Sequence, residues 1–190
     1  YRAILESNAE EYERLARMIS DMLFLAKAEN GLVLVREELV DVAHEVRQLF
    51  DFYELSADEK RIDLQLRGEG ALHGDRLMLR RALGNLISNA LRHTPSEGTV
   101  SVEIAKDRAQ LRIKVENTGE PIPEAHLARF FERFYRGDPA RQHGVGEGAG
   151  LGLSITRAIT RAHGGEVSAA SSNGVTSFLL TLPLEIHQSE

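Results

Sequence analysis

Residues 144–153 read GVGEGAGLGL and run directly into an apolar helical pattern. Glycine has no Cβ and tolerates positive φ, so the backbone of such a loop approaches a ligand closely. The helix that we expect to start near Gly150 points the positive end of its dipole, and its free N–H groups, at the same place. The stretch predicts a phosphate-binding loop, and an exposed surface loop without a ligand is the alternative interpretation.

A dinucleotide-binding loop is a second alternative, because residues 144–149 fit the loose pattern GxGxxA. That interpretation requires a buried strand immediately before the loop and a βαβ unit around it. The preceding residues 133–143, RFYRGDPARQH, are too charged and too broken to form that strand. The dinucleotide-binding interpretation is therefore disfavoured, and phosphate binding and an exposed surface loop both remain open for this segment.

The composition restricts the partners and the compartment. The chain has 190 residues, 42% of them hydrophobic, and a formal net charge of -6, which disfavours nucleic acid as a partner. It has no cysteine, and its seven histidines lack the spacing of a helical metal pair. No apolar run approaches the ~20 residues that span a bilayer, and no signal peptide is visible. Since the chain opens at Tyr1 within a helical pattern, we expect a cytoplasmic piece of a longer polypeptide.

The first thirty residues predict one amphipathic helix. Its stripe steps by three and four residues and consists of Leu5, Asn8, Tyr12, Leu15, Ile19, Met22 and Ala26. Such a helix belongs to a bundle and requires partners. Asn30-Gly31 has the composition of a helix C-terminus, so we divide the chain into residues 1–30 and a domain of residues 31–190.

The remaining pattern predicts an α+β fold. Asp41 and Asp75 are expected to cap two helices, and the second is expected to bury Leu77, Leu79, Leu83, Leu86, Ile87 and Leu91 before it stops at Thr94-Pro95. Strands are expected at 62–66, around Leu72, at 99–105, 111–116, 166–170 and 175–182, and a short helix at 124–131. Strands with helices grouped between them indicate a two-layer α/β sandwich with a mixed sheet.

Three further stretches and the end of the glycine loop stand in order along the chain. They are NLISNALRH (85–93), ENTGEPI (116–122), FFERFYR (130–136) and GAGLGL (148–153). Together they resemble the N, G1, F and G2 boxes of sensor histidine kinases, within the ATPase class shared with gyrase and mismatch-repair proteins. Residues 11–23 resemble the second helix of the dimerisation domain in heavy-metal-responsive kinases. The resemblance implies a Bergerat-type ATPase/kinase fold preceded by a bundle helix.

The paired asparagines of the first stretch are candidate metal ligands. Asn85 and Asn89 lie four apart, so on a helix both amides project from one face, and their neutral oxygens suit Mg²⁺ that also takes phosphate oxygens. Two solvated asparagines are the simpler alternative. The resemblance assigns them to Mg²⁺ and ATP. In related ATPases that hydrolyse ATP, a glutamate acts as general base at the position of Asn85. Because an amide cannot accept that proton, we expect ATP to be held without rapid hydrolysis.

The resemblance also assigns the adenine contacts. Asn117 stands where the family has an aspartate that accepts a hydrogen bond from the adenine amino group, and an amide oxygen can accept it without charge assistance. At least two of the residues Phe130, Phe131, Phe134 and Tyr135 are expected in the core, and Arg141 is a further candidate phosphate contact. The full set of expected nucleotide contacts is Asn85, Asn89, Arg92, His93, Asn117, Gly119, Arg136, Gly148, Gly150, Leu151, Gly152, Leu153 and Thr176.

The resemblance implies transfer of the γ-phosphoryl group of ATP to a histidine. His44-Glu45-Val46-Arg47 imitates the start of the acceptor motif, but Gln48-Leu49 replaces Thr-Pro and the stretch follows the bundle helix. We therefore expect the acceptor upstream of Tyr1 and no catalytic residue in this chain. The expected partners are the phosphoacceptor helix and a response regulator, and the parent is expected to be a homodimer anchored in a bacterial inner membrane. A hydrolytic or serine-directed ATPase of the same fold is the alternative function.

Overall fold

A five-stranded mixed sheet is the centre of the fold, in the order β2-β4-β5-β7-β6. The computed structural model describes residues 2–135 and 150–185. Strand β2 pairs with β4 in parallel and all other neighbours are antiparallel, so the predicted mixed sheet is confirmed. The strands are β2 (Asp63–Gly68), β4 (Thr99–Asp107), β5 (Gln110–Thr118), β6 (Glu166–Ser172) and β7 (Val175–Pro183).

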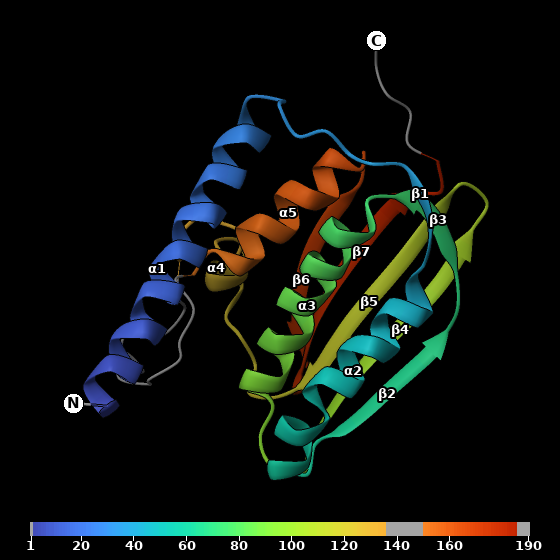
Figure 1. Ribbon diagram of the computed structural model, residues 1–190. Coiled ribbons are helices and arrows are strands. Elements are labelled where there is room, and N and C mark those ends of the chain that lie inside the picture. Colours follow the sequence, from blue (N-terminus) through green and yellow to red (C-terminus); the bar gives the residue numbers. More distant parts are fainter. Residues whose placement is uncertain (1, 136–149, 186–190) are drawn as a thin grey trace.

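One face of the sheet is covered by three helices that lie side by side (Figure 1). They are α2 (Val42–Glu59), α3 (Arg76–His93) and α5 (Gly152–Ala162), and a short helix α4 (Glu124–Leu127) lies near β6. Alternate residues of β5 and β7 are buried, which places one side of each strand in the core beneath these helices. The two-layer α/β sandwich follows from this alternation.

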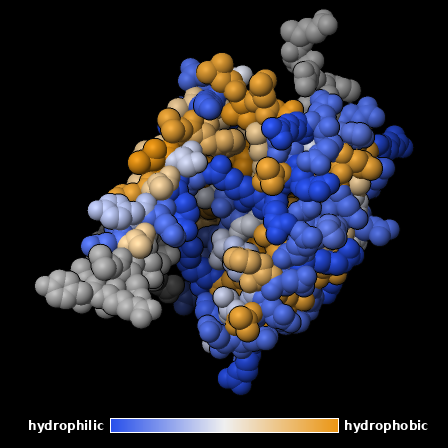
Figure 2. All heavy atoms as spheres, viewed as in Figure 1, coloured by the Kyte–Doolittle hydropathy of each residue, from blue (hydrophilic) through white to orange (hydrophobic). Residues whose placement is uncertain are grey.

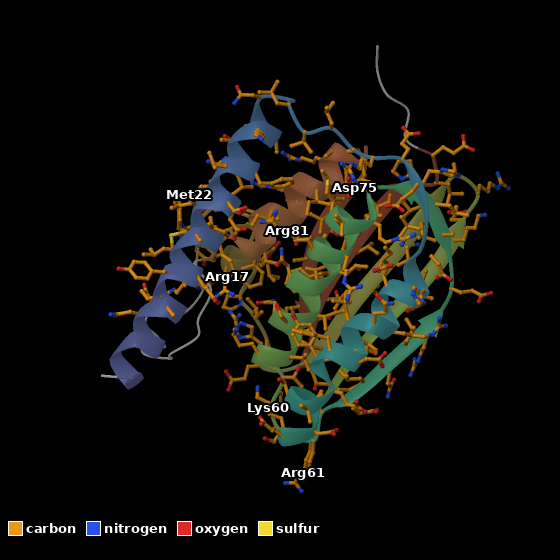
Figure 3. All side chains as sticks on the ribbon, viewed as in Figure 1. Arg17, Met22, Lys60, Arg61, Asp75 and Arg81 are labelled. Carbon is orange, nitrogen blue, oxygen red and sulfur yellow. The ribbon has the colours of Figure 1, made fainter. Side chains whose placement is uncertain are left out.

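Aspartates begin two of the helices as predicted. The Asp41 side chain accepts a hydrogen bond from the N–H of His44, and the Asp75 side chain accepts one from Met78, both at 3.0 Å. At the other end of α2 and α3, the ammonium group of Lys60 lies 3.0 Å from the carbonyl oxygen of Leu91. Figure 3 labels Asp75 and Lys60 at opposite ends of α3.

Two predicted details are wrong. Leu77 is 72% exposed, whereas Leu79, Leu83, Leu86, Ile87 and Leu91 are buried. Leu77 lies in the first turn of α3 on the side away from the i, i+3, i+4 stripe that faces the sheet, so no core is available to it. The helix expected at 124–131 ends at Leu127, and the following residues form turns. An additional strand, β1 (Glu38–Asp41), was not predicted; it pairs with β3 (Ala71–Gly74) in a separate small sheet.

The first helix, α1 (Arg2–Glu29), ends as its sequence predicts. Gly31 has φ +65, its N–H donates to Ala28, and the next N–H, of Leu32, reaches back to the carbonyl oxygen of Lys27. This pair of bonds is a Schellman motif, which requires the left-handed conformation that glycine adopts at low cost. Helix α1 therefore ends through this local motif at Gly31.

Helix α1 packs on α5 through a face different from the predicted stripe. Leu25 is 4% exposed and lies in a second core cluster with Ala82, Leu151, Ile155 and Ile159. Asp21 pairs with Arg81 of α3, and the Arg81 guanidinium also lies 5.0 Å from the centre of the Phe24 ring. From Asn8 to Ala26, the predicted stripe is exposed instead. Apolar side chains gather over α1 and the segment after it (Figure 2); they include Leu15, Ile19, Met22, Leu23, Leu32 and Leu34.

Within the described ranges 2–135 and 150–185, no helix combines the length and apolarity needed to cross a membrane.

Candidate nucleotide-binding site

The asparagine pair of α3 lies against the start of α5. The Asn85 side-chain amide donates a hydrogen bond of 3.0 Å to the carbonyl oxygen of Gly152. This bond uses the amino half of the amide and leaves Oδ1 as its acceptor atom. Asn89, one helical turn further on the same face, is half-buried. The Asn85 amide therefore lies beside the positive end of the α5 dipole, a suitable place for phosphate, and Asn89 follows it on the same face of α3.

A polar row crosses three adjacent strands at the end of the sheet. Asn117 of β5 is the direct register partner of Thr176 of β7, and Thr176 is the partner of Ser171 of β6. Asn117 and Thr176 are each 4% exposed. The Asn117 amide donates from Nδ2 to the carbonyl oxygen of Thr118 at 3.1 Å, so its Oδ1 is the half that remains to accept a bond from a ligand.

The segment after β5 approaches the end of α3 closely. A Cβ placed on Gly119 would lie 3.3 Å from the carbonyl oxygen of His93 and 3.4 Å from the Asn117 amide nitrogen. The Gly119 N–H donates to the carbonyl oxygen of Gly174, in the β6–β7 turn. Arg92 and His93 are both exposed at this end of α3. Sequence positions 93, 119 and 174 thus meet at one place, next to the polar row.

The glycine motif leads into α5 through a left-handed residue. Gly150 has φ +72, and a Cβ there would lie 3.1 Å from the backbone of Phe134, which itself has φ +60. The Phe134 N–H donates to the Gly150 carbonyl oxygen at 3.1 Å. Leu151 follows at the helix N-cap and is 2% exposed, and Leu153 packs partly against the main core. The motif residues at 150–153 therefore combine a tight backbone turn with two apolar anchors.

The aromatic residues before the loop are divided between core and surface, as predicted. Phe131 is 8% exposed, and Phe130 stacks on Phe178 with ring centroids 6.2 Å apart. Phe134 is 52% exposed. The hydroxyl of Tyr135 lies 2.5 Å from Nδ1 of His126, on α4. Two of the four residues, Phe130 and Phe131, therefore belong to the core.

Three expected phosphate contacts lie outside the described residues: Arg136, Arg141 and Gly148. The other residues of the predicted set belong to one end of the helical layer and of the sheet, because α3, α5 and the ends of β5 and β7 meet there.

Sequence reasoning missed two polar residues with tertiary hydrogen bonds: Ser171, which is half-buried beside this site, and His163, which is buried at the other end of α5. His163 is 1% exposed at the C-cap of α5; Nδ1 lies 2.8 Å from the Ile159 carbonyl oxygen, and Nε2 accepts from the N–H of Asp75. Burial lowers the pKa of His163, and the bond to Ile159 and the charge of Asp75 oppose that shift in part. Ser171 stands in the alternating pattern of β6, and that pattern alone would have placed it on the inner face.

A divalent metal would require phosphate oxygens among its ligands. In the part of the chain that the structure describes, no group of three or more His, Cys, Asp or Glu is arranged to hold a metal ion. The Asn85 amide orientation, with Nδ2 on Gly152 and Oδ1 as acceptor, fits an oxygen ligand for Mg²⁺. Neutral amide oxygens are weak ligands alone, so the residues fit a nucleotide-bound ion and not an independent metal site.

Residues 74–186 match the family described as histidine kinase-, DNA gyrase B- and HSP90-like ATPase. The chain is 46% identical to sensor histidine kinase CusS of Escherichia coli K12, over 95% of this chain and 38% of that protein. It is 37% identical to sensor protein CzcS of Cupriavidus metallidurans, over 97% of this chain and 39% of that protein. The chain thus spans well under half the length of these curated relatives.

Solved structures have the same fold. Full-length ShkA in complex with AMPPNP superposes with a TM-score of 0.83 at 25% identity, over 99% of this chain and 40% of that chain. Histidine kinase AdeS of Acinetobacter baumannii superposes with a TM-score of 0.81 at 20% identity, over 97% of this chain and 85% of that chain. A histidine kinase ThkA crystallised with response regulator TrrA matches with a TM-score of 0.72 at 21% identity, over 93% of this chain and 49% of that chain.

Proposed function

The chain belongs to the family of histidine kinase-, DNA gyrase B- and HSP90-like ATPases, and we propose that it is the ATP-binding catalytic domain of a sensor histidine kinase of the heavy-metal-sensor type. Residues 31–190 form the ATP-binding domain in this proposal, and residues 1–30 are the second helix of a dimerisation domain. The identity to CusS over nearly the whole chain supports both assignments.

One observation carries the proposal: the Asn85 amide is bonded to Gly152, the first residue of α5. This bond joins the asparagine pair to the glycine motif, although the two are 67 residues apart in sequence. A triphosphate placed at the α5 N-terminus would therefore meet amide oxygens on one side and free backbone N–H groups on the other.

Each residue of the site has a separate task in the proposed complex. Asn117 and Thr176 contact adenine, and Gly119 and His93 lie next to the base. Arg92 and Arg136 contact phosphates, and the backbone from Gly148 through Gly150, Leu151, Gly152 and Leu153 surrounds the triphosphate. Asn89 and Asn85 hold Mg²⁺, which when bound neutralises phosphate charge. No residue in this set needs to exchange a proton with ATP.

The proposed reaction is phosphoryl transfer to a histidine supplied by another segment. The bond between the γ-phosphorus and its bridging oxygen breaks, a phosphorus–nitrogen bond forms at the imidazole, ADP leaves, and the imidazole loses its proton. Catalysis consists mainly of positioning and charge neutralisation. His44 is a poor acceptor candidate, because it lies on α2 and its Nε2 is 3.0 Å from the Gln48 amide nitrogen.

Hydrolysis of ATP by the same fold is the competing function. A hydrolytic enzyme needs a group that accepts a proton from the attacking water, and Asn85 has only an amide that is already bonded to Gly152. The site therefore favours retention of ATP until an acceptor arrives.

The exposed stripe of α1 supports a bundle with further helices. Tyr12 is 72% exposed and Ile19 59%, although both are apolar positions of a regular heptad-like spacing. We assign this stripe to the phosphoacceptor helix of the same or a paired subunit, within a membrane-anchored homodimer. A response regulator is the expected recipient of the phosphoryl group, as the ThkA complex with TrrA suggests for a related fold.

Calorimetric titration with a non-hydrolysable ATP analogue, with and without Mg²⁺, tests the proposal. We expect binding that Mg²⁺ strengthens, and we expect Asn89→Ala to remove this Mg²⁺ dependence while the fold stays intact. Asn8→Ala, at an exposed position of α1, is the matched control and should bind like the parent. Mg²⁺-dependent affinity that is unchanged in Asn89→Ala would remove Asn89 from the site.

A further inference from the structure

We propose that Ser171 is a positioning residue for adenine recognition, whose hydroxyl fixes both the adenine-facing hydroxyl of Thr176 and the segment that follows β5. This role rests on the proposed function, because Thr176 and Asn117 contact adenine only if a nucleotide binds at the end of the sheet. It concerns a residue outside the four motif stretches.

The Ser171 hydroxyl has two partners from different segments. Its oxygen accepts a hydrogen bond of 3.0 Å from the backbone N–H of Ile122, in the segment between β5 and α4. It also lies 3.2 Å from the hydroxyl oxygen of Thr176. A single side chain on β6 therefore connects β7 to the chain that leaves β5.

The position of Ser171 is set by strand alternation. Val167, Ala169 and Ser171 are the half-buried residues of β6, whereas the residues between them are exposed. On the inner face the rows across β6, β7 and β5 are apolar until the last one: Ala169, Phe178 and Val115 precede Ser171, Thr176 and Asn117. A row of three adjacent polar side chains at the end of an apolar surface is costly to bury unless its groups are paired.

The hydroxyl protons and lone pairs of this row decide which of its groups can donate to a ligand and which can accept. A serine hydroxyl has one proton and two lone pairs, and the Ile122 N–H occupies one lone pair. When Ser171 donates its proton to Thr176, the Thr176 proton is available to a ligand acceptor. Asn117 supplies the opposite group, because its Nδ2 is used on Thr118 and Oδ1 accepts.

An acceptor beside a donor complements the edge of adenine, which carries an amino group next to a ring nitrogen. Guanine carries a carbonyl oxygen and an N–H at the same edge, so its pattern is the reverse. Ser171 therefore contributes to the preference for adenine without contact with the base, since it supplies the proton that keeps Thr176 a donor.

The test compares the affinities of ATP and GTP in the presence of Mg²⁺. Loss of one neutral hydrogen-bonding partner is expected to weaken ATP binding by about fivefold in Ser171→Ala. GTP binding should not change, so the ratio of the two affinities should fall by the same factor. Ser171→Thr keeps the hydroxyl and should retain the parental ratio. Ser168→Ala, on the exposed face of the same strand, is the matched control.

Two further measurements separate positioning from a loss of fold. Hydrogen exchange at the Ile122 amide should accelerate in nucleotide-free Ser171→Ala and not in Ser168→Ala. In a Thr176→Val background, Ser171→Ala should weaken ATP binding less than in the parent, because only the bond to Ile122 is left to lose. An unchanged ATP affinity in Ser171→Ala, or equal losses for ATP and GTP, would overturn the role of Ser171. A parent chain that binds neither nucleotide would contradict the proposed function itself.

Discussion

The backbone N–H of Asp75, at the N-cap of α3, donates a hydrogen bond of 3.0 Å to Nε2 of His163, at the C-cap of α5. Because the Ile159 carbonyl oxygen can only accept, Nδ1 of the same imidazole carries the proton and the ring is neutral. The Asp75 carboxylate also accepts from the N–H of Arg36, in the segment after α1. One junction thus joins the two helices of the site to the chain that leads from α1.

Acidification should destabilise this junction. The pKa of His163 is lowered by burial from its ordinary 6.5, so the unfolded chain takes up a proton at higher pH than the folded protein does. The contribution of the neutral ring to stability is therefore complete above pH 6.5 and is lost as the pH falls from there toward the lowered pKa. Urea unfolding at a series of pH values from about 7.5 to about 5, which brackets the ordinary pKa of histidine, measures this contribution.

The matched variants are His163→Gln and His73→Gln, since His73 is an exposed residue of β3. The pH dependence should become shallower in His163→Gln and remain parental in His73→Gln. If the two variants keep the same slope as the parent, His163 is not the group that titrates.

Lys60 should stabilise the end of α3. Its ammonium group lies 3.0, 3.3 and 3.4 Å from the carbonyl oxygens of Leu91, Arg92 and Thr94, where the negative end of the helix dipole favours a cation. Lys60→Met keeps most of the apolar stem and removes the donors, at an expected cost of about 1–2 kcal/mol in the free energy of unfolding. Lys106→Met, at an exposed position of β4, should cost less than about 0.5 kcal/mol. Equal effects in chemical denaturation would exclude the capping role.

Leu25 should hold α1 against α5. It is 4% exposed in the cluster that contains Leu151 and Ile155. Leu25→Ala is expected to cost about 2–4 kcal/mol for this contact, whereas Leu23→Ala, at a position 59% exposed, should cost little. Faster hydrogen exchange along α1 in Leu25→Ala, with β5 and β7 still protected, is the expected pattern. Loss of protection throughout the sheet would show instead that α1 and the sheet unfold as one unit.

Asn117→Asp should strengthen ATP binding and weaken the fold. A carboxylate accepts the adenine amino group with charge assistance, which we expect to improve affinity by at most about tenfold, or 1.4 kcal/mol. The same change removes the donor to the Thr118 carbonyl and places a charge where only 4% of the residue is exposed, so stability should fall by about 1 kcal/mol. Calorimetry with ATP and GTP checks the first effect. ATP and GTP affinities that both equal those of the parent would exclude the adenine contact.

Local signals in the sequence were sufficient for most of the fold. The caps at Asp41 and Asp75 and the helix end at Gly31, which has φ +65, are decided by neighbouring residues, and the structure has each of them. Pairings between segments that are distant in sequence could not be predicted from such local signals. The strand β1 could not be predicted, because Leu39 is 63% exposed and the segment is held by its partner β3 and not by its own alternation.

Some of the site residues could likewise be predicted from the sequence, and others could not. Motif order predicted which residues would gather, and Asn85, Asn117 and Gly152 lie at one end of the sandwich. Ser171 and His163 have no motif, and their importance depends on bonds to Thr176, Ile122 and Asp75 that exist only after the sheet and helices have formed. The family resemblance gives no indication of these two residues. Their contribution follows from burial, which turns an ordinary serine or histidine into a required partner.

Helix α1 has apolar residues on two separate faces about a third of a turn apart, with Leu25 and Met18 toward α5 and Tyr12 and Ile19 toward solvent. A helix with a single apolar stripe would have to leave one partner in order to join another. In α1, packing on α5 and association with further helices use different residues. Neither has to be lost for the other to form, so their free energies should add. Assembly through the outer side would then leave the ATP-binding domain attached in its present orientation, and any reorientation of that domain would have to be driven by a separate source of free energy.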